Sequence, residues 1–188
     1  MPSWFVAFPV SGVSWFTRLA PPPVGTRVLA AADLHLTVAF LGNVGEARAR
    51  TAFRGLAPAA IQAFEILLGP IVPMGNPRRP SALSALVERT DREGRSIAEL
   101  LTAPRDAILE AAALPTETRA MKPHVTLARL RRRAGVDERQ SALTWAAACD
   151  LASTRIGLDR IGLYTAARDR TERAYDIVES RDLANLSS

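Results

Sequence analysis

Cysteine is almost absent from this sequence, which has Cys149 as its one thiol in 188 residues. A single cysteine excludes a disulfide within the chain and a zinc site built from cysteines. Long hydrophobic runs are missing too, because the longest apolar stretches are far too short to span a bilayer. The first residues lack the basic segment and long apolar core of a signal peptide. We therefore expect a soluble, cytoplasmic protein with no membrane partner.

Lysine is equally scarce, since Lys122 is the only one, and the net charge of +5 is carried by arginine. A basic protein favours anionic partners such as RNA or nucleotides. The bias toward arginine can also reflect the base composition of the genome, so it does not by itself indicate phosphate recognition. The 48% content of hydrophobic residues is typical of a globular chain. The length suits one domain or two small lobes.

Histidine occurs twice, and both copies lie in the same short motif. Residues 35–41 read His-Leu-Thr-Val-Ala-Phe-Leu, and residues 124–130 read His-Val-Thr-Leu-Ala-Arg-Leu. The shared pattern is His, apolar, Thr, apolar, Ala, any residue, Leu. A lone histidine on an apolar strand is usually a buried, hydrogen-bonded core residue. Two in matching contexts favour a functional site.

The pattern of apolar residues predicts alternating strands and helices. The expected strands are residues 4–8, 33–41, 64–68, 82–87, 122–130, 156–164 and 174–178. The expected helices are residues 14–19, 46–56, 92–113 with a kink or break at Pro104, and one capped by Asp137 that runs to about residue 148. Residues 70–80 are expected to form a long turn between two strands.

After each motif the predicted order is helix, strand, turn, strand. This duplication predicts an α+β fold with two lobes related by an approximate two-fold axis. We expect one domain over residues 1–188, with lobe one at roughly 1–90, lobe two at roughly 91–188, and the boundary near residues 88–92. Terminal elements are expected to be exchanged between the lobes.

Each histidine shares a strand face with the threonine two residues later, so His35 projects with Thr37 and His124 with Thr126. Across a two-fold axis the two imidazoles would supply one general base and one general acid near neutral pH. Substitution at phosphorus needs such a pair on opposite sides of the phosphorus, with the two hydroxyls near its other oxygens. Two histidines without a carboxylate cluster make a poor metal site, so no metal or other cofactor is expected; Asp33 could add one oxygen ligand.

The two motifs, set in Asp33-Leu-His-Leu-Thr-Val-Ala-Phe-Leu-Gly and Lys122-Pro-His-Val-Thr-Leu-Ala-Arg, resemble the 2H phosphoesterases, and within them the bacterial RNA 2′,3′-cyclic phosphodiesterases, also called 2′-5′ RNA ligases. The resemblance implies a bilobal α+β fold with antiparallel sheets lining a central cleft, helices outside, and opening of a 2′,3′-cyclic phosphate to a 2′-phosphate. It implies His124 as the general base and His35 as the general acid, with roles that the two-fold symmetry makes easy to exchange. The expected partner is RNA or a nucleotide, and the expected state is a monomer.

The resemblance also implies that Arg129 binds phosphate. Strict strand alternation would turn Arg129 away from His124, so either the strand bulges or twists there, or the side chain curls back. Alternation leaves Lys122 on the cleft side as a second phosphate candidate. Phe40 holds the position that matches Arg129 and could stack on a base, although a strand phenylalanine is more often core. Residues 131–133, a run of three arginines, read better as a solvated loop than as a specific RNA contact.

Two alternatives to RNA 2′,3′-cyclic phosphodiesterase activity stay open. The first is another substrate of the same chemistry, either a small cyclic nucleotide or a 2′-5′ linked oligonucleotide, and RNA joining is the same reaction in reverse. The second is an RNA- or nucleotide-binding module without catalysis.

Overall fold

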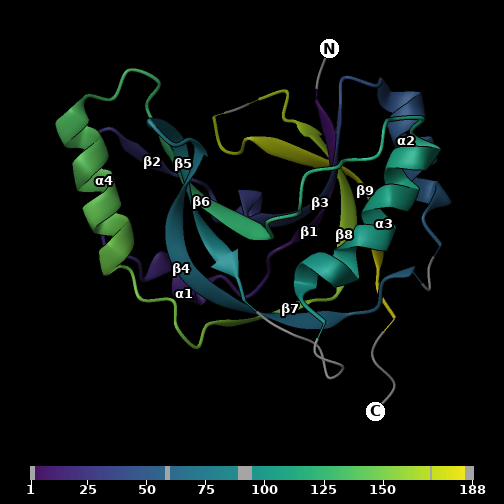
Figure 1. Ribbon diagram of the computed structural model, residues 1–188, viewed down its shortest axis with the longest axis horizontal. Coiled ribbons are helices and arrows are strands. Elements are labelled where there is room, and N and C mark those ends of the chain that lie inside the picture. The colour runs from purple at the N-terminus through teal and green to yellow at the C-terminus, as the bar shows by residue number, and fades with distance from the viewer. Residues whose placement is uncertain (1–2, 58–59, 89–94, 170, 185–188) are drawn as a thin grey trace.

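The computed structural model describes residues 3–57, 60–88, 95–169 and 171–184. These residues form a mixed structure, which confirms the predicted α+β class (Figure 1). The strands are β1 (Trp4–Pro9), β2 (Thr26–Val28), β3 (His35–Gly42), β4 (Phe64–Asn76), β5 (Arg79–Val87), β6 (His124–Leu130), β7 (Arg155–Leu158), β8 (Arg160–Ala166) and β9 (Tyr175–Asp182). The helices are α1 (Ser14–Thr17), the 3-10 turn η1 (Ala31–Asp33), α2 (Glu46–Gly55), α3 (Ile97–Ala111) and α4 (Val136–Ala148).

The strands form one antiparallel sheet in the order β7-β4-β5-β6-β3-β1-β8-β9, with β2 also paired to β6. The two motif strands β3 and β6 therefore lie at its centre. The β4–β5 hairpin follows β3 in sequence but pairs with β6. The β8–β9 hairpin follows β6 but pairs with β1, on the edge of β1 opposite to β3. Exchange of elements between the two halves of the chain thus goes beyond the terminal segments. The expected boundary near residues 88–92 lies largely outside the described residues.

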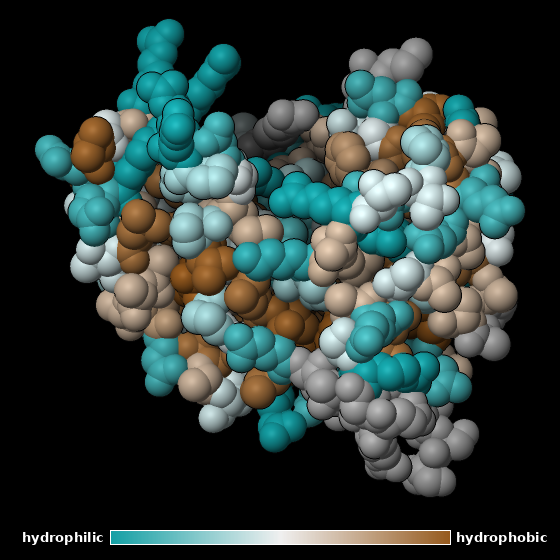
Figure 2. All heavy atoms as spheres, viewed as in Figure 1, coloured by the Kyte–Doolittle hydropathy of each residue, from teal (hydrophilic) through white to brown (hydrophobic). Residues whose placement is uncertain are grey.

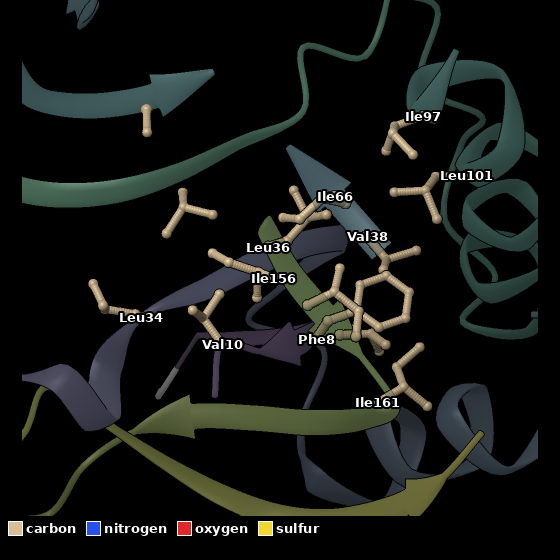
Figure 3. Packing of buried hydrophobic residues seen from close by; sticks show 14 of the residues in the cluster. Phe8, Val10, Leu34, Leu36, Val38, Ile66, Ile97, Leu101, Ile156 and Ile161 are labelled. Atoms are coloured by element: carbon tan, nitrogen blue, oxygen red, sulfur yellow. The ribbon is translucent and has the colours of Figure 1, made fainter. Parts of the chain in front are cut away.

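Buried aliphatic and aromatic side chains join the sheet to its helices. Helices α2 and α3 pack together and cover the β1–β3–β8 region, whereas α4 packs on β4, at the opposite side of the molecule (Figure 1). Figure 3 shows Val38 of β3 directed toward Ile97 and Leu101 of α3, with Leu36 close to Ile66. The apolar residues of the first motif thus anchor β3 in the core, which leaves its polar residues on the other face.

Several details of the chain differ from the sequence-based predictions. The single strand expected at residues 156–164 is divided into β7, which pairs with β4, and β8, which pairs with β9. The prediction of a long turn at residues 70–80 is wrong, because β4 and β5 are paired as far as Asn76 and Arg79. Strand β7 pairs with β4 only from Phe64 to Leu67, so Pro70 and Pro73 lie where this edge of β4 has no described strand partner and a missing N–H is tolerated.

Helix α3 continues through Pro104, so of the expected kink or break the break is wrong. Its apolar face, which includes Leu101 and Ile108, is buried and outweighs the lost backbone hydrogen bond. Residues 92–94, where the helix was expected to begin, lie outside the described residues. Helix α4 is capped at Gly135, whose N–H donates to Glu138 at 2.8 Å, and Asp137 lies inside the first turn instead of capping it.

Candidate active site

The two histidines are brought together by the pairing of the two motif strands. Leu36 of β3 is the antiparallel partner of Val125 of β6. In this register, the neighbouring positions put His35 opposite Thr126 and Thr37 opposite His124. Each histidine therefore faces the threonine of the other motif. All four side chains line one cavity of about 1030 Å³.

Both imidazoles are held by the same backbone contact. Nδ1 of His35 lies 2.6 Å from the carbonyl oxygen of Asp33, and Nδ1 of His124 lies 2.7 Å from that of Lys122. A carbonyl can only accept, so Nδ1 carries the proton in each neutral ring. Nε2 is then the nitrogen left to take up or release a proton. Two rings with matching tautomers are the pair that acid–base chemistry needs.

A β-bulge at the same position of each motif decides where Phe40 and Arg129 point. Val38 has no partner between the pairs Thr37–Ala7 and Ala39–Val6, and Leu127 none between Thr126–Ser84 and Ala128–Leu83. The extra residue shifts the alternation, so two adjacent buried residues precede an exposed one in both strands. Phe40 and Arg129 consequently line the cavity with the histidines. Of the alternatives left open for Arg129, the structure shows the bulge, and it shows an equivalent one in β3.

Phe40 is 63% exposed, so it belongs to the cavity wall and not to the core. Lys122 behaves differently from the prediction. It is not among the residues that line the cavity, and its backbone carbonyl orients His124. The structure therefore brings together six of the seven predicted site residues and gives Lys122 a backbone role.

Several residues of the cavity were missed by the sequence-based reading. Arg27 comes from β2, Arg131 from the segment after β6, and Phe5 and Tyr175 from β1 and β9. Residues 131–133 are exposed and lie outside the helices and strands, as expected of a solvated loop, and Arg131 also lines the cavity. None of these residues lies in a repeated motif, and they reach the site only through strand pairing.

His35 sits among aromatic rings. Its ring centroid lies 4.9 Å from that of Phe5, 5.5 Å from Tyr164 and 5.3 Å from Tyr175, the last at an interplanar angle of 88°. Burial in this setting lowers the pKa of the His35 imidazole from its usual 6.5, and the nearby His124 and Arg129 lower it further, against the opposing effect of Asp33. Burial also raises the pKa of Tyr164, so that ring stays neutral. His35 is thus held mainly uncharged at neutral pH in the free protein.

Asp33 joins the His35 strand to the start of β9. Its buried carboxylate accepts hydrogen bonds from the backbone N–H groups of Ala174, at 2.8 and 2.9 Å, and Tyr175, at 3.1 Å. The same residue uses its carbonyl to orient His35. The carboxylate is therefore committed to backbone donors, which corrects its reading as a possible metal ligand. Within the described residues, no group of three or more His, Cys, Asp and Glu side chains could hold a metal ion.

The hydroxyl of Thr126 has a buried partner. Ser84, its cross-strand neighbour on β5, is fully buried, and its Oγ lies 3.1 Å from Thr126 Oγ1. Thr37 faces Ala7 at the corresponding position of β1. The two halves of the site therefore differ in how firmly each hydroxyl is held.

Comparison with known proteins supports the fold. No protein-family model and no curated protein sequence matches the chain. Among solved structures, LigT from E. coli in complex with 3′-AMP has a TM-score of 0.64 at 19% identity, covering 97% of this chain and 99% of LigT. TT0787 of Thermus thermophilus has a TM-score of 0.67 at 22% identity, covering 97% of this chain and 98% of TT0787. A protein described as a phosphoesterase has a TM-score of 0.65 at 18% identity, covering 98% of this chain and 100% of that protein.

These structures belong to the 2H phosphoesterase superfamily, which is the group that the two motifs resemble. At such identities the likeness establishes the fold, and the predicted α+β class with a large antiparallel sheet is confirmed. No helix among the described residues has the length and apolar character needed to cross a membrane.

Proposed function

We propose that this protein is a cyclic phosphodiesterase that opens 2′,3′-cyclic phosphate ends of RNA to 2′-phosphates without a metal ion. The observation that carries the proposal is the pair of histidines in one cavity, each with Nδ1 bound to a backbone carbonyl and Nε2 left for proton transfer. In that cavity Thr37, Thr126 and Arg129 supply donors for the phosphoryl oxygens. E. coli LigT, which shares the fold, has been crystallised with 3′-AMP and with phosphate.

The proposed reaction needs one proton removed and one delivered. Nε2 of neutral His124 accepts a proton from water as its oxygen attacks the phosphorus. The bond from phosphorus to the ribose 3′ oxygen breaks, and protonated His35 gives its Nε2 proton to that oxygen. The product is a 2′-phosphate, with His124 protonated and His35 neutral. Exchange of one proton with solvent at each ring restores the starting state.

The lowered pKa of His35 bears on this order of roles. A low pKa favours the neutral ring in the free protein, which would suit a base. Once protonated, however, a ring of low pKa gives up its proton more readily, and the negative charge of a bound phosphodiester raises the protonated fraction. We keep His35 as the acid and His124 as the base, the order that the resemblance implies, and give its test in the Discussion.

The experiment that tests the function is the reaction of an RNA oligonucleotide ending in a 2′,3′-cyclic phosphate, in buffer with EDTA. We expect conversion to a 2′-phosphate end, and a loss of at least about 10³-fold in rate for His35→Ala and for His124→Ala. Arg132→Gln, at an exposed residue outside the cavity, is the matched control and should react normally. Full activity in either histidine variant, a requirement for metal, or a 3′-phosphate product would contradict the proposal.

The same assay separates the alternatives. Faster turnover of a nucleoside 2′,3′-cyclic phosphate or a 2′-5′ linked oligonucleotide than of the RNA end would favour another substrate. Binding of the RNA end without turnover would favour a non-catalytic module.

A further inference from the structure

One wall of the cavity carries three arginines that come from two neighbouring segments. Arg27 lies on β2, Arg129 on β6 and Arg131 just after β6, and all three line the cavity and are exposed. Arg27 and Arg129 are direct antiparallel partners. Like charges placed directly opposite one another on a sheet are destabilising. The Arg27–Arg129 pair is therefore expected to lower the stability of the sheet at the edge of the cavity.

The three arginines differ from nine other arginines of the described residues, which have partners within the protein. Arg50, Arg54, Arg105, Arg155, Arg160 and Arg173 form ion pairs with carboxylates, and Arg48, Arg139 and Arg181 donate to backbone carbonyls. Within the described part of the chain, the side chains of Arg27, Arg129 and Arg131 have neither kind of partner. The backbone N–H of Arg131 donates to the Gly25 carbonyl at 2.9 Å, which holds the two segments together at this wall. Among the described residues, no carboxylate forms an ion pair with this positive surface.

Strand β6 connects the arginines to the histidines, because it carries both Arg129 and His124. The partners of β6 change from Thr26, Arg27 and Val28 of β2 to Leu36 of β3 as the strand is followed from Leu130 to Val125. At roughly 3.3 Å per residue, Arg129 lies on the order of 10 Å along the strand from Thr126. Arginine side chains can cover part of this distance. Figure 2 shows hydrophilic side chains gathered over the end of the molecule where the segment between β6 and α4 lies.

We propose that, beside Arg129, which binds the first phosphate, Arg27 and Arg131 form a second phosphate subsite. It takes the phosphate on the 5′ oxygen of the terminal nucleotide, while the cyclic phosphate lies between His35 and His124. In an RNA chain this second phosphate is the diester to the preceding nucleotide. The inference rests on the proposed function for the position of the first phosphate and narrows the substrate to the end of an RNA chain, as opposed to a nucleoside cyclic phosphate.

The test measures binding of reaction products by calorimetry, so it does not depend on turnover. The probes are uridine 2′-phosphate, uridine 2′,5′-bisphosphate, and the dinucleotide UpU carrying a 2′-phosphate. We expect the wild-type protein to bind the bisphosphate and the dinucleotide about tenfold or more tightly than the monophosphate. The double variant Arg27→Gln/Arg131→Gln should lose that gain, whereas Arg132→Gln should keep it.

The salt dependence and the stability supply readouts that a structural role would not give. The slope of log affinity for the dinucleotide against log salt should fall in the double variant, by roughly 0.7 for each lost phosphate contact. The melting temperature of Arg27→Gln should equal or exceed that of the wild type, because the like-charge pair with Arg129 is removed.

If the wild-type protein bound the monophosphate and the bisphosphate with equal affinity, the proposal of a second phosphate subsite would be wrong. Binding of the dinucleotide no tighter than that of the monophosphate would overturn its assignment to an RNA chain. Absence of turnover combined with the expected affinities would contradict the proposed catalysis and leave the subsite standing. The two hypotheses therefore fail separately.

Discussion

The hydroxyls of Thr126 and Ser84 lie 3.1 Å apart across β6 and β5, whereas Thr37 faces Ala7 across β3 and β1. A Thr→Val substitution removes a hydroxyl with little change in shape. In Thr126→Val the fully buried Ser84 hydroxyl would be left without this partner, which should lower the free energy of unfolding by about 1–3 kcal/mol. Thr37→Val should leave it almost unchanged. Urea denaturation of both variants checks the difference.

Both threonine variants should lose activity, because each hydroxyl lines the cavity beside a histidine. Adding Ser84→Ala to Thr126→Val should restore much of the stability but not the rate. Equal stability losses for the two threonines would show that the Ser84 contact contributes nothing.

The acid and base roles can be separated with a leaving group that needs no proton. In bis(4-nitrophenyl) phosphate the nitrophenolate departs as a stable anion, so the general acid matters little while the base is still required. We expect His35→Ala to keep most of the wild-type rate on this ester, and His124→Ala to lose on the order of 10²-fold or more. The rates are measured by nitrophenolate release. A larger loss in His35→Ala than in His124→Ala would show that His35 is the base and His124 the acid.

The stability of the protein should depend on pH through His35 as the pH falls below about 6.5. Burial lowers the folded-state pKa of His35 below its unfolded value of 6.5. Below 6.5 the unfolded chain binds the proton first, so stability falls as the pH drops toward the folded pKa; above 6.5 both states are neutral and this contribution is constant. His35→Asn, whose amide can replace Nδ1–H as a donor to Asp33, should flatten the curve. Urea midpoints across this range measure it, and identical slopes in both proteins would contradict the burial of a neutral ring.

Phe40 should contribute to binding and not to folding. Its side chain is 63% exposed and lines the cavity. Stacking on a base contributes about 1–3 kcal/mol, so Phe40→Ala should weaken nucleotide binding about 5- to 150-fold. Ribose 2,3-cyclic phosphate, which has no base, should bind both proteins alike. For comparison, Phe53→Ala at a buried position should cost about 3–5 kcal/mol of stability. An unchanged nucleotide affinity in Phe40→Ala would show that Phe40 does not stack on the base.

Much of the fold and half of the site were determined by the sequence itself. The alternation within each motif fixes that His35 and Thr37, and His124 and Thr126, share a face, because successive strand residues point to opposite sides. The apolar positions of the same motifs, such as Leu36 and Val125, fix which face is buried. Local periodicity also predicted most strands and helices. It failed at Pro70, Pro73 and Pro104, where an unpaired strand edge or a buried helix face overrides a local preference.

Only the tertiary structure decided what surrounds the two histidines. The bulges at Val38 and Leu127 turn Phe40 and Arg129 into the cavity, and a bulge is set by pairing with the neighbouring strand. Arg27 and Tyr175 lie outside both motifs and reach the site from β2 and β9, so no local pattern marks them. The lowered pKa of His35 likewise depends on burial among rings from β1, β8 and β9. A repeated motif encodes an acid and a base locally, whereas their environment and the positive wall beside them arise only when distant strands pair.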